Sequence, residues 1–483
     1  MEPVELVALF HAEPEDRVAV RLYRAVQKAA RGGKVLPSEV LPSSRAAAKA
    51  LGISRNSVTA AYDLLLAEGV IETAAGRRPR LRALAGPITP APVVAPALSR
   101  RGLSWAANPR AARDSMGGRL FTPGEPDPAL FPADAFAQRL RRAARLLAPS
   151  ASGYADYHGL PGLRSAIADQ LVRHRGLRVG PDEVLVLPGM QAALALIAQV
   201  LADPGETALV EDPGYGGARA AFAGAGLQLA ALPVDDEGAR MADAGPARLI
   251  YVTPSTQYPT GARMTLPRRQ ALLAAARDWG AVVIEDDYDS EFVWRGGAIP
   301  ALHALADDTS VIYLGTAAKS LAPGLRLAWA VVPPALAPLL AQAQRNLGMG
   351  ANVHAQAAFA GFLADGAWRG HLRRISRAYA AREALLSTAL TARFGPALRL
   401  RRPDGGLQLV AEFTPPRDEG PILEVLHLAG FGVAALSSYC LGSPRRGIVI
   451  GFAEADTLRV RRFCDTLAQA LDMAPASCAA DLD

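Results

Sequence analysis

Residues 311–329 read VIYLGTAAKSLAPGLRLAW, and this stretch is the most informative one for the fold of the larger part of the chain. Its first residues form an apolar run of strand length, and Thr316 and Lys319 follow where the run ends. Lysine occurs at four positions in the chain, and Lys319 is the only one after residue 49. Arginine does not readily form imines, so a lysine kept among arginines points to amine chemistry. The alternative is a surface lysine that was retained by chance. The residues around Lys319 must distinguish between the two interpretations.

Four more apolar runs in the same part of the chain end in residues of catalytic type. VLVLP precedes Gly189, Met190 and Gln191, and TALVEDPG precedes Tyr215. LIYVTP precedes residues 255–261, and AVVIEDD carries Asp286. Ligands of doubly wound α/β sheets bind beyond the carboxyl ends of the strands, so these run ends should converge on one crevice. A lysine, a buried carboxylate and a phosphate cradle are the groups that pyridoxal phosphate requires.

Residues 313–329 resemble the lysine segment of fold type I aminotransferases. The resemblance implies that Lys319 forms a Schiff base with pyridoxal 5′-phosphate, that Asp286 pairs with the pyridine nitrogen and that Tyr215 stacks on the ring. The implied phosphate ligands are Gly189, Met190, Gln191, Thr316, Arg326 and, reaching the neighbouring subunit of a homodimer, Tyr154. Any one of these residues alone could be structural, but their order and their positions after strands favour the cofactor site.

The pattern departs from that of a working aminotransferase. Tyr258 in QYPTG stands where such enzymes carry an asparagine, and Tyr288 can reach the same cofactor oxygen instead. Val449 and Ile450 in GIVIGFA occupy the positions expected for the arginine that clamps a substrate carboxylate. Arg219 is a candidate clamp or a structural residue. These departures predict cofactor binding with weakened turnover.

The N-terminal part is basic. Residues 17–85 hold thirteen Lys or Arg and four Asp or Glu, whereas the whole chain has a net charge of +6, so the remainder is net negative. Such an asymmetric charge distribution predicts a module that binds a polyanion. The alternative is a charged face that only contacts solvent.

Two short helices are predicted in this module. Ser43 or Ser44 can cap SRAAAKAL, which Gly52 ends, and Ser54 can cap SRNSVTAAYDLLLAEG. This is the pattern of a helix-turn-helix, and VIETAAGRRPRL reads as a two-stranded wing after it. In the second helix the predicted core-facing residues are Val58, Tyr62, Leu65 and Leu66.

The stretches LYRAVQKAA and LPSSRAAAKALGISRNSVTAAYDLLLAEGVIET resemble the winged helix-turn-helix of the GntR superfamily of bacterial repressors. The first turns of the second helix would face base edges, and the arginines of the wing would meet phosphates. The expected DNA-binding residues are Ser43, Ser44, Arg45, Ser54, Arg55, Asn56, Ser57, Thr59, Arg77 and Arg78.

The chain has 483 residues, enough for several domain-sized units. We expect the DNA-binding module over residues 16–84, a Pro/Ala/Arg-rich linker over 85–115 and the pyridoxal-phosphate domain over 116–475. This order resembles the MocR family of bacterial transcription regulators. The resemblance implies a multidomain fold, with a winged helix-turn-helix followed by an α/β aminotransferase fold of type I and a smaller C-terminal α+β subdomain.

The resemblance also implies a function. The chain would bind double-stranded DNA with paired half-sites as a homodimer, and it would sense pyridoxal phosphate or a small amine or amino acid. The alternative is an active aminotransferase that carries an appended DNA-binding head. The absence of an apolar run of about 20 residues argues against a membrane span. The acidic start and the three cysteines favour the cytoplasm. No constellation around a histidine or cysteine predicts a metal site.

Overall fold

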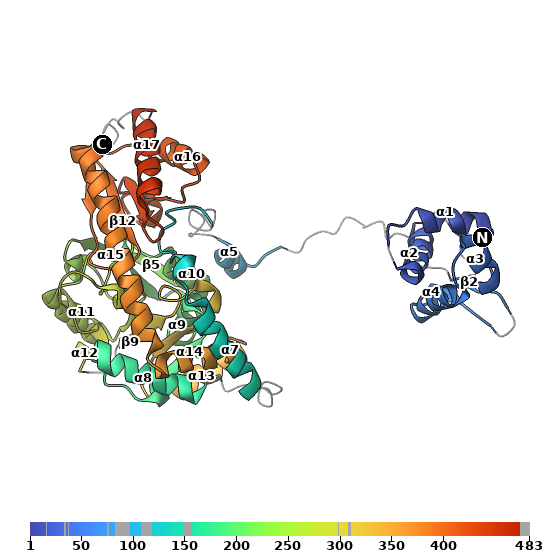
Figure 1. The fold of residues 1–483 in the computed structure, drawn as a ribbon. Helices are drawn as coiled ribbons and strands as arrows, with labels where there is room; N and C mark the ends of the chain where they lie inside the picture. The colour runs from blue at the N-terminus through green and yellow to red at the C-terminus, as the bar shows by residue number, and fades with distance from the viewer. Residues whose placement is uncertain are drawn as a thin grey trace. The chain divides into compact units, whose positions relative to one another are not determined.

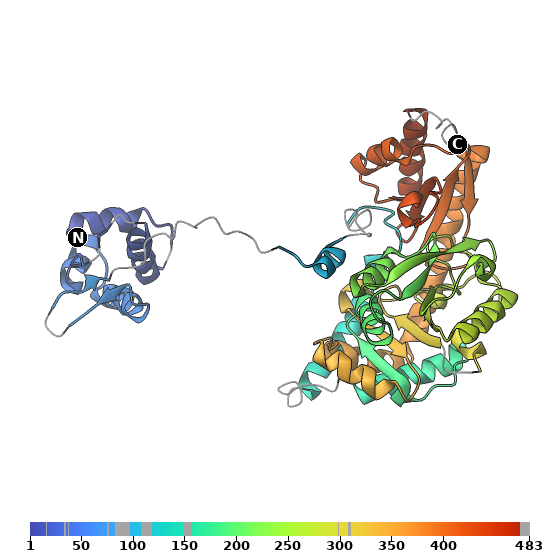
Figure 2. The same cartoon turned by 180° about the vertical axis from the view of Figure 1, so that it is seen from behind.

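The structure is a computed structural model in which residues 1–15, 17–32, 35–36, 38–74, 77–82, 97–107, 118–147, 157–297, 299–307 and 311–473 are described. The chain divides into two compact units, Met1–Ala97 and Leu98–Asp483. Figures 1 and 2 show both units from opposite sides. The described helices include no apolar stretch of the length that a bilayer requires.

The first unit packs four helices against a short antiparallel hairpin in its described part. The helices are α1 (Pro3–His11), α2 (Val18–Arg31), α3 (Ser44–Leu51) and α4 (Arg55–Ala67), and the hairpin pairs β1 (Ile71–Glu72) with β2 (Arg80–Leu81). One apolar cluster joins all of these elements. The unit starts earlier than the expected boundary at residue 16, because Leu6 and Phe10 of α1 are buried in this cluster.

The predicted caps and turn of the helix pair are confirmed. The Ser43 side chain accepts a hydrogen bond from the Ala46 amide at 3.2 Å, and Gly52 ends α3 with a left-handed φ of 66°. The Ser54 side chain accepts from the Ser57 amide at 3.0 Å at the start of α4. Each cap satisfies an amide that the helix itself leaves without a partner.

The predicted core stripe of α4 holds with one exception. Val58, Tyr62 and Leu65 are buried, and the Tyr62 hydroxyl donates to the Pro42 carbonyl at 2.9 Å. Leu66 is 43% exposed, so its placement in the core was wrong. At 100° per residue Leu66 lies about 80° around the helix from Val58, beyond the edge of the buried stripe.

The second unit is built on an eight-stranded sheet. Its strand order is β3-β10-β9-β8-β7-β4-β5-β6. Strands β9, β8, β7, β4 and β5 run parallel, while β10 and β6 pair antiparallel with their neighbours. The bounds are β3 (Val184–Leu187), β4 (Thr207–Asp212), β5 (Gln228–Asp235), β6 (Gly238–Ala239), β7 (Leu249–Val252), β8 (Val282–Asp286), β9 (Val311–Thr316) and β10 (Ala328–Val331).

Helices cover both faces of this sheet. One face packs against α9 (Met190–Leu201), α10 (Gly216–Ala225) and α13 (Ala337–Asn346). The other face packs against α7 (Ala133–Leu146), α8 (Pro161–Arg175), α11 (Leu266–Trp279), α12 (Leu302–Leu305) and α14 (Val353–Ala364). This three-layer arrangement confirms the predicted α/β fold.

A smaller α+β layer completes the unit. Its antiparallel sheet has the order β11-β12-β14-β13, formed by β11 (Leu398–Arg401), β12 (Gln408–Phe413), β14 (Gly447–Gly451) and β13 (Ala434–Ala435). Helices α16 (Glu419–Leu428) and α17 (Thr457–Met473) pack with it. The 28-residue helix α15 (Ala367–Phe394) runs from the large sheet's helices to this layer (Figure 1).

One helix lies inside the segment expected to be a linker. Helix α5 (Arg100–Ala106) packs against α10. A Cβ atom added at Gly224 of α10 would lie 2.4 Å from the Trp105 ring, so the indole rests on a position where only glycine leaves room. The described part of residues 85–115 is therefore in part a docked helix. Single 3₁₀ turns occur at Pro128–Leu130, Pro181–Glu183, Met241–Asp243, Ser290–Phe292, Pro323–Leu325, Gly395–Ala397 and Leu436–Tyr439.

Candidate functional site

The ends of the central strands surround one cavity, as the sequence predicts. Its volume is about 150 Å³, and it lies where β3, β4, β7, β8 and β9 finish. Parallel strands direct the residues after their carboxyl ends to the same edge of a sheet. The lining residues are Gly189, Met190, Gln191, Tyr215, Tyr251, Thr253, Tyr258, Asp286, Tyr288, Thr316, Ala318, Lys319, Pro323, Arg326 and Leu327.

Lys319 stands three residues after β9 and reaches across the cavity. Its ammonium group donates to the carbonyl oxygen of Gly124 at 2.5 Å. Gly124 has a left-handed φ of 69°, and a Cβ atom there would lie 3.0 Å from the lysine Nζ. Glycine therefore leaves room for the lysine head group, which belongs to the cavity rather than to the surface. The alternative of a surface lysine kept by chance is not supported.

Asp286 ends β8 on the cavity floor. Its Oδ2 accepts a hydrogen bond from the Tyr251 hydroxyl at 2.6 Å, whereas its Oδ1 is buried without a hydrogen-bond partner among the described residues. Burial raises the pKa of Asp286 to about 7, against the opposing effect of the Tyr251 hydrogen bond. A cationic N–H donor at Oδ1 would satisfy the free oxygen and stabilise the charged carboxylate.

Another part of the lining suits an anion. Gly189 precedes α9 with φ 109°, and a Cβ atom there would lie 3.2 Å from the Arg326 guanidinium carbon. The first amides of α9, including those of Met190 and Gln191, face this part as unpaired helix donors do. The Thr316 hydroxyl donates to the Leu327 carbonyl at 3.1 Å and also accepts from the Ala318 amide.

Aromatic rings form a further part of the lining. The ring centroids of Tyr215 and Tyr258 lie 5.7 Å apart, and those of Tyr258 and Tyr288 lie 5.8 Å apart, both edge to face. The buried Tyr258 hydroxyl has no hydrogen-bond partner among the described residues. The Tyr288 hydroxyl accepts from Gln408 Nε2 at 3.4 Å, and burial raises the pKa of Tyr288.

These residues fit pyridoxal 5′-phosphate. A carboxylate oxygen without a hydrogen-bond partner among the described residues, an amine, aromatic rings and an anion cradle line one cavity, and these are the groups that the cofactor requires. Tyr154, the predicted ligand from the neighbouring subunit, lies outside the described residues.

The structure also explains the missing carboxylate clamp. Val449 is fully buried in an apolar cluster with Tyr258, Tyr288 and Tyr439, while Ile450 belongs to the core of the small layer. Arg219 is structural, because it donates to the carbonyls of Ser438 at 2.7 Å and Cys440 at 2.9 Å. Among the described residues that line the cavity, Arg326 is the one arginine.

Sequence reasoning missed two residues of this site. Tyr251 lies in β7 within an unbroken apolar run, so its hydroxyl contact with Asp286 could not be distinguished from ordinary core packing. Gly124 precedes β3, the first strand of the second unit, by about sixty residues, and FTPGEPD offered no more than a turn signal.

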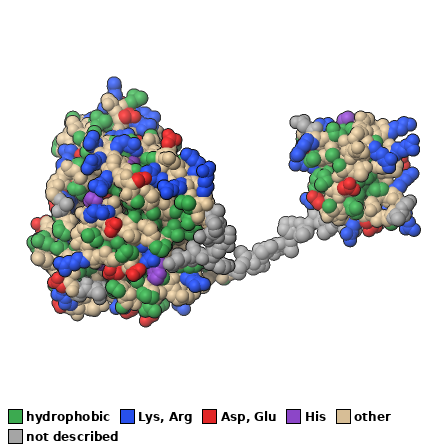
Figure 3. Space-filling model, turned by 60° about the horizontal axis from the view of Figure 1, so that its bottom comes forward, with side chains coloured by type: hydrophobic (Ala, Val, Ile, Leu, Met, Phe, Trp, Pro, Cys, Tyr) green, Lys and Arg blue, Asp and Glu red, His purple; other side chains and the backbone are tan. Residues whose placement is uncertain are grey.

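The predicted DNA-binding residues of the first unit lie on or next to α3, α4 and the hairpin. Arg45, Ser54, Arg55, Asn56, Thr59, Arg77 and Arg78 are exposed, while Ser43, Ser44 and Ser57 are half-buried. The Arg55 Nε donates to the Ser44 hydroxyl at 3.3 Å and thereby joins the starts of the two helices. Figure 3 shows Lys and Arg side chains around the surface of this unit.

A groove of about 410 Å³ runs beside these residues. Its lining residues are Ser43, Ser44, Thr59, Tyr62, Asp63, Leu66, Thr73, Arg77, Arg78 and Pro79. Half of these are residues that the sequence assigned to DNA contact. Leu66, wrongly expected in the core, lies on the wall of this groove.

Comparisons with known proteins agree with both units. A family model for aminotransferase class I and II matches residues 124–466. The chain is 36% identical over 471 residues to the probable rhizopine catabolism regulatory protein MocR of Rhizobium meliloti, covering 96% of this chain and 95% of that protein. It is 32% identical over 458 residues to the HTH-type pyridoxine biosynthesis transcriptional regulator PdxR of Corynebacterium glutamicum, covering 94% and 96%.

Among solved structures, the chain is similar to LysN, the α-aminoadipate aminotransferase of Thermus thermophilus, with a TM-score of 0.71 and 28% identity. That likeness covers 78% of this chain and 98% of LysN, which was solved with N-(5′-phosphopyridoxyl)-L-leucine. The enzyme thus accounts for the second unit alone, whereas the regulators match nearly the whole chain. The chain therefore belongs to the MocR-type transcriptional regulators, in which the aminotransferase class I and II domain carries pyridoxal 5′-phosphate as cofactor.

Proposed function

We propose that this regulator binds double-stranded DNA through a winged helix-turn-helix made of α3, α4 and the β1–β2 hairpin. In this proposal Arg55, Asn56 and Thr59 face base edges, and Arg77 and Arg78 contact phosphates on the flanks. The exposure of these five side chains and the groove beside them support it. The remaining predicted contacts are Ser43, Ser44, Arg45, Ser54 and Ser57.

The second unit acts as the sensor in this proposal. Lys319 attaches the cofactor, Asp286 holds its ring nitrogen, and Arg326 with Thr316 and the start of α9 holds its phosphate. Tyr215, Tyr258 and Tyr288 enclose the ring. When bound, pyridoxal phosphate supplies an aldehyde that reacts with amines and a ring that accepts electrons.

One observation favours sensing over turnover. The free Oδ1 of Asp286 and the amine of Lys319 provide for the cofactor, yet buried Val449 stands among tyrosines where an enzyme needs a cation for the substrate carboxylate. An α-amino acid would therefore bury its carboxylate without a dedicated partner, which is costly. The signal that fits this chemistry is pyridoxal phosphate itself or an amine without an α-carboxylate.

The signal must then reach DNA. A ligand shifts DNA binding only through its different affinities for two arrangements of the protein. We propose a cytoplasmic homodimer in which Tyr154 contacts the phosphate of the neighbouring subunit. A two-fold dimer presents two heads and predicts an operator with paired half-sites.

The test is a footprint of the purified protein on its own upstream DNA, with and without pyridoxal phosphate, beside Lys319→Ala. A specific footprint that changes with the cofactor in the wild type, and not in Lys319→Ala, is the expected result. A specific footprint indifferent to the cofactor would exclude pyridoxal phosphate as the signal. The lack of any specific footprint, together with efficient amine transfer to a keto acid that Lys319→Ala abolishes, would establish the aminotransferase alternative.

A further inference from the structure

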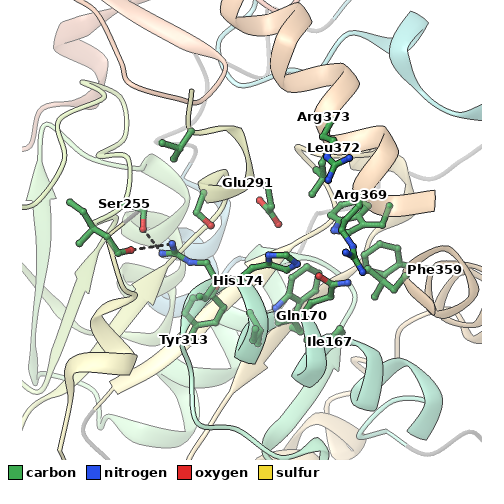
Figure 4. Close-up of a pocket in the computed structure, with 18 of the residues that line it drawn as sticks. Ile167, Gln170, His174, Ser255, Glu291, Tyr313, Phe359, Arg369, Leu372 and Arg373 are labelled. Carbon is green, nitrogen blue, oxygen red and sulfur yellow. Dashed lines mark hydrogen bonds between the residues drawn. The ribbon is translucent and has the colours of Figure 1, made fainter. Parts of the chain in front are cut away.

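A second and larger cavity lies in the same unit, away from the cofactor. Its volume is about 430 Å³, and it is bounded by α8, α14 and the first turns of α15 (Figure 4). No residue of its described lining is shared with the cofactor cavity. This size is within the range of small-molecule sites.

The inner wall of this cavity is apolar and aromatic. Leu171 of α8, Phe359 and Leu363 of α14 and Trp329 of β10 are all buried, and the Trp329 and Phe359 rings are stacked with centroids 6.2 Å apart. Such a wall holds an apolar body by removing its surface from water. The Trp329 Nε1 also has no hydrogen-bond partner among the described residues.

The mouth of the cavity is cationic. Arg369 and Arg373 project from α15 toward the same space as His174 from α8 (Figure 4). All three are exposed, and neither arginine side chain has a hydrogen bond or ion pair within the described part of the chain. Partial loss of solvent around His174 lowers its pKa, and the positive charge of Arg369 lowers the pKa further.

The other charged groups of the lining do not balance these arginines. Arg175 is held by Asp287, with its Nε donating at 2.7 Å. Glu291 is the one acidic residue of the described lining, and its Oε2 is buried without a partner. Burial and the neighbouring Asp287 raise the pKa of Glu291 to about 8, so this carboxyl group keeps its proton near neutral pH.

We propose that this cavity binds a small amphipathic carboxylate. The apolar body would lie against Trp329, Phe359 and Leu363, and the carboxylate would lie between Arg369 and Arg373 at the mouth. Arginine pairs with carboxylates through parallel hydrogen bonds, and the exposed position of the arginines lets the anion keep part of its hydration. This site is independent of the proposed cofactor chemistry, because its residues are separate.

The test uses the full-length holoprotein and calorimetric titration with 3-phenylpropionate. Its neutral counterpart, 3-phenyl-1-propanol, has the same apolar body and no charge. We expect the carboxylate to bind with a dissociation constant between about micromolar and about millimolar, which is usual for a ligand of this size. We expect the alcohol to bind at least about tenfold more weakly, since it lacks the charge-assisted hydrogen bonds.

A matched pair of double variants separates this site from general charge attraction. Arg369→Ala/Arg373→Ala removes the two arginines of the mouth. Arg141→Ala/Arg377→Ala removes two exposed arginines, one of α7 and one of α15, that lie outside the lining. The first should weaken carboxylate binding by about tenfold or more and leave alcohol binding unchanged, whereas the second should change carboxylate binding by less than about twofold.

Three results would overturn the proposal: no binding of the carboxylate by the wild type, equal binding of the alcohol, or equal losses in the two double variants. The cofactor absorption spectrum serves as an independent readout and should be the same in all three proteins. A failure of this site therefore cannot be mistaken for a failure of the cofactor site.

Discussion

Asp286 ends β8 and Asp287 follows it, yet the two carboxylates have different hydrogen-bond partners. The Asp286 carboxylate accepts from Tyr251 and faces the cofactor cavity. The Asp287 carboxylate accepts from Arg175, Ser290 and Tyr313 beside the second cavity. The Asp287 amide still donates to the Leu314 carbonyl of β9 at 2.9 Å, so the extended backbone continues past the strand end and successive side chains point to opposite faces. Substitutions at the two positions should have different effects.

The variant Asp286→Asn should lower the affinity for pyridoxal phosphate and alter the absorption spectrum of the holoprotein. The ring nitrogen would lose its charged partner while the side chain keeps its size. Spectral titration with the cofactor measures both effects. An unchanged spectrum would mean that Asp286 is not the partner of the ring.

The variant Asp287→Asn should instead lower the free energy of unfolding by about 3–5 kcal/mol, because the partly buried Arg175 would lose its counter-charge. Denaturant unfolding measures the loss. Asp169→Asn is a suitable control, since Asp169 and Arg173 form an exposed pair at 3.9 Å whose removal should cost less than about 1 kcal/mol. Similar losses in both variants would contradict the assignment of Asp287 to a buried ion pair.

Without the cofactor, Asp286 should also make stability depend on pH. Its pKa is raised to about 7 in the folded chain, while the unfolded carboxyl group titrates near about 4. Between these values the folded state binds more protons, so its stability falls as pH rises, by at most about 1.4 kcal/mol per pH unit from this group. Unfolding of apo wild type and apo Asp286→Asn at about pH 5 and about pH 7 should show a smaller fall in the variant. An equal fall in the free energy of unfolding in the two proteins would contradict this prediction.

In the first unit, Arg55→Ala and Arg78→Ala should weaken DNA binding in different ways. Loss of Arg55 should cost about 1–3 kcal/mol on the operator and little on unrelated DNA, if this side chain reads a guanine. Loss of Arg78 should weaken binding to both DNAs alike and reduce the salt dependence by about one counterion. Binding titrations at several salt concentrations distinguish the two patterns. The base-reading role of Arg55 would be refuted by equal losses on both DNAs.

A further prediction concerns the contact between α5 and α10. Gly224→Ala should displace α5, because the added Cβ atom would overlap the Trp105 ring. Hydrogen exchange over residues 98–107 should then become faster, while unfolding of the rest of the unit stays nearly unchanged. If the overlap is the cause, adding Gly224→Ala to Trp105→Ala should have no further effect on that exchange.

Much of this structure could be predicted from local signals. Ser43, Gly52 and Ser54 set the helix ends of the first unit through backbone rules that depend on a few neighbours. Lys319, Asp286 and Gly189 could be placed at one edge because each follows an apolar run of strand length. Strand ends of a parallel sheet meet whatever their distance in sequence.

Other features depend on contacts between distant residues, which local patterns do not encode. Trp105 lies in a Pro/Ala/Arg-rich stretch that looks like a linker, and only the bare surface at Gly224 explains why it packs. Leu66 is as apolar as Leu65 but lies just beyond the buried stripe. The second cavity is lined by residues of α8, α14 and α15, which come from separate parts of the chain, so no single sequence motif predicts it.

The long helix α15 has a mechanical consequence. Trp368 near its start is packed in the layer of α8 and α14, whereas Leu386 and Leu390 near its end are packed under the small sheet. Its 28 residues span about 42 Å as one continuous rod. A tilt of a few degrees at the end that carries Arg369 would displace the far end by a few ångströms. Because α15 is packed into both layers, a small tilt at its Arg369 end would displace the small α+β layer at its other end.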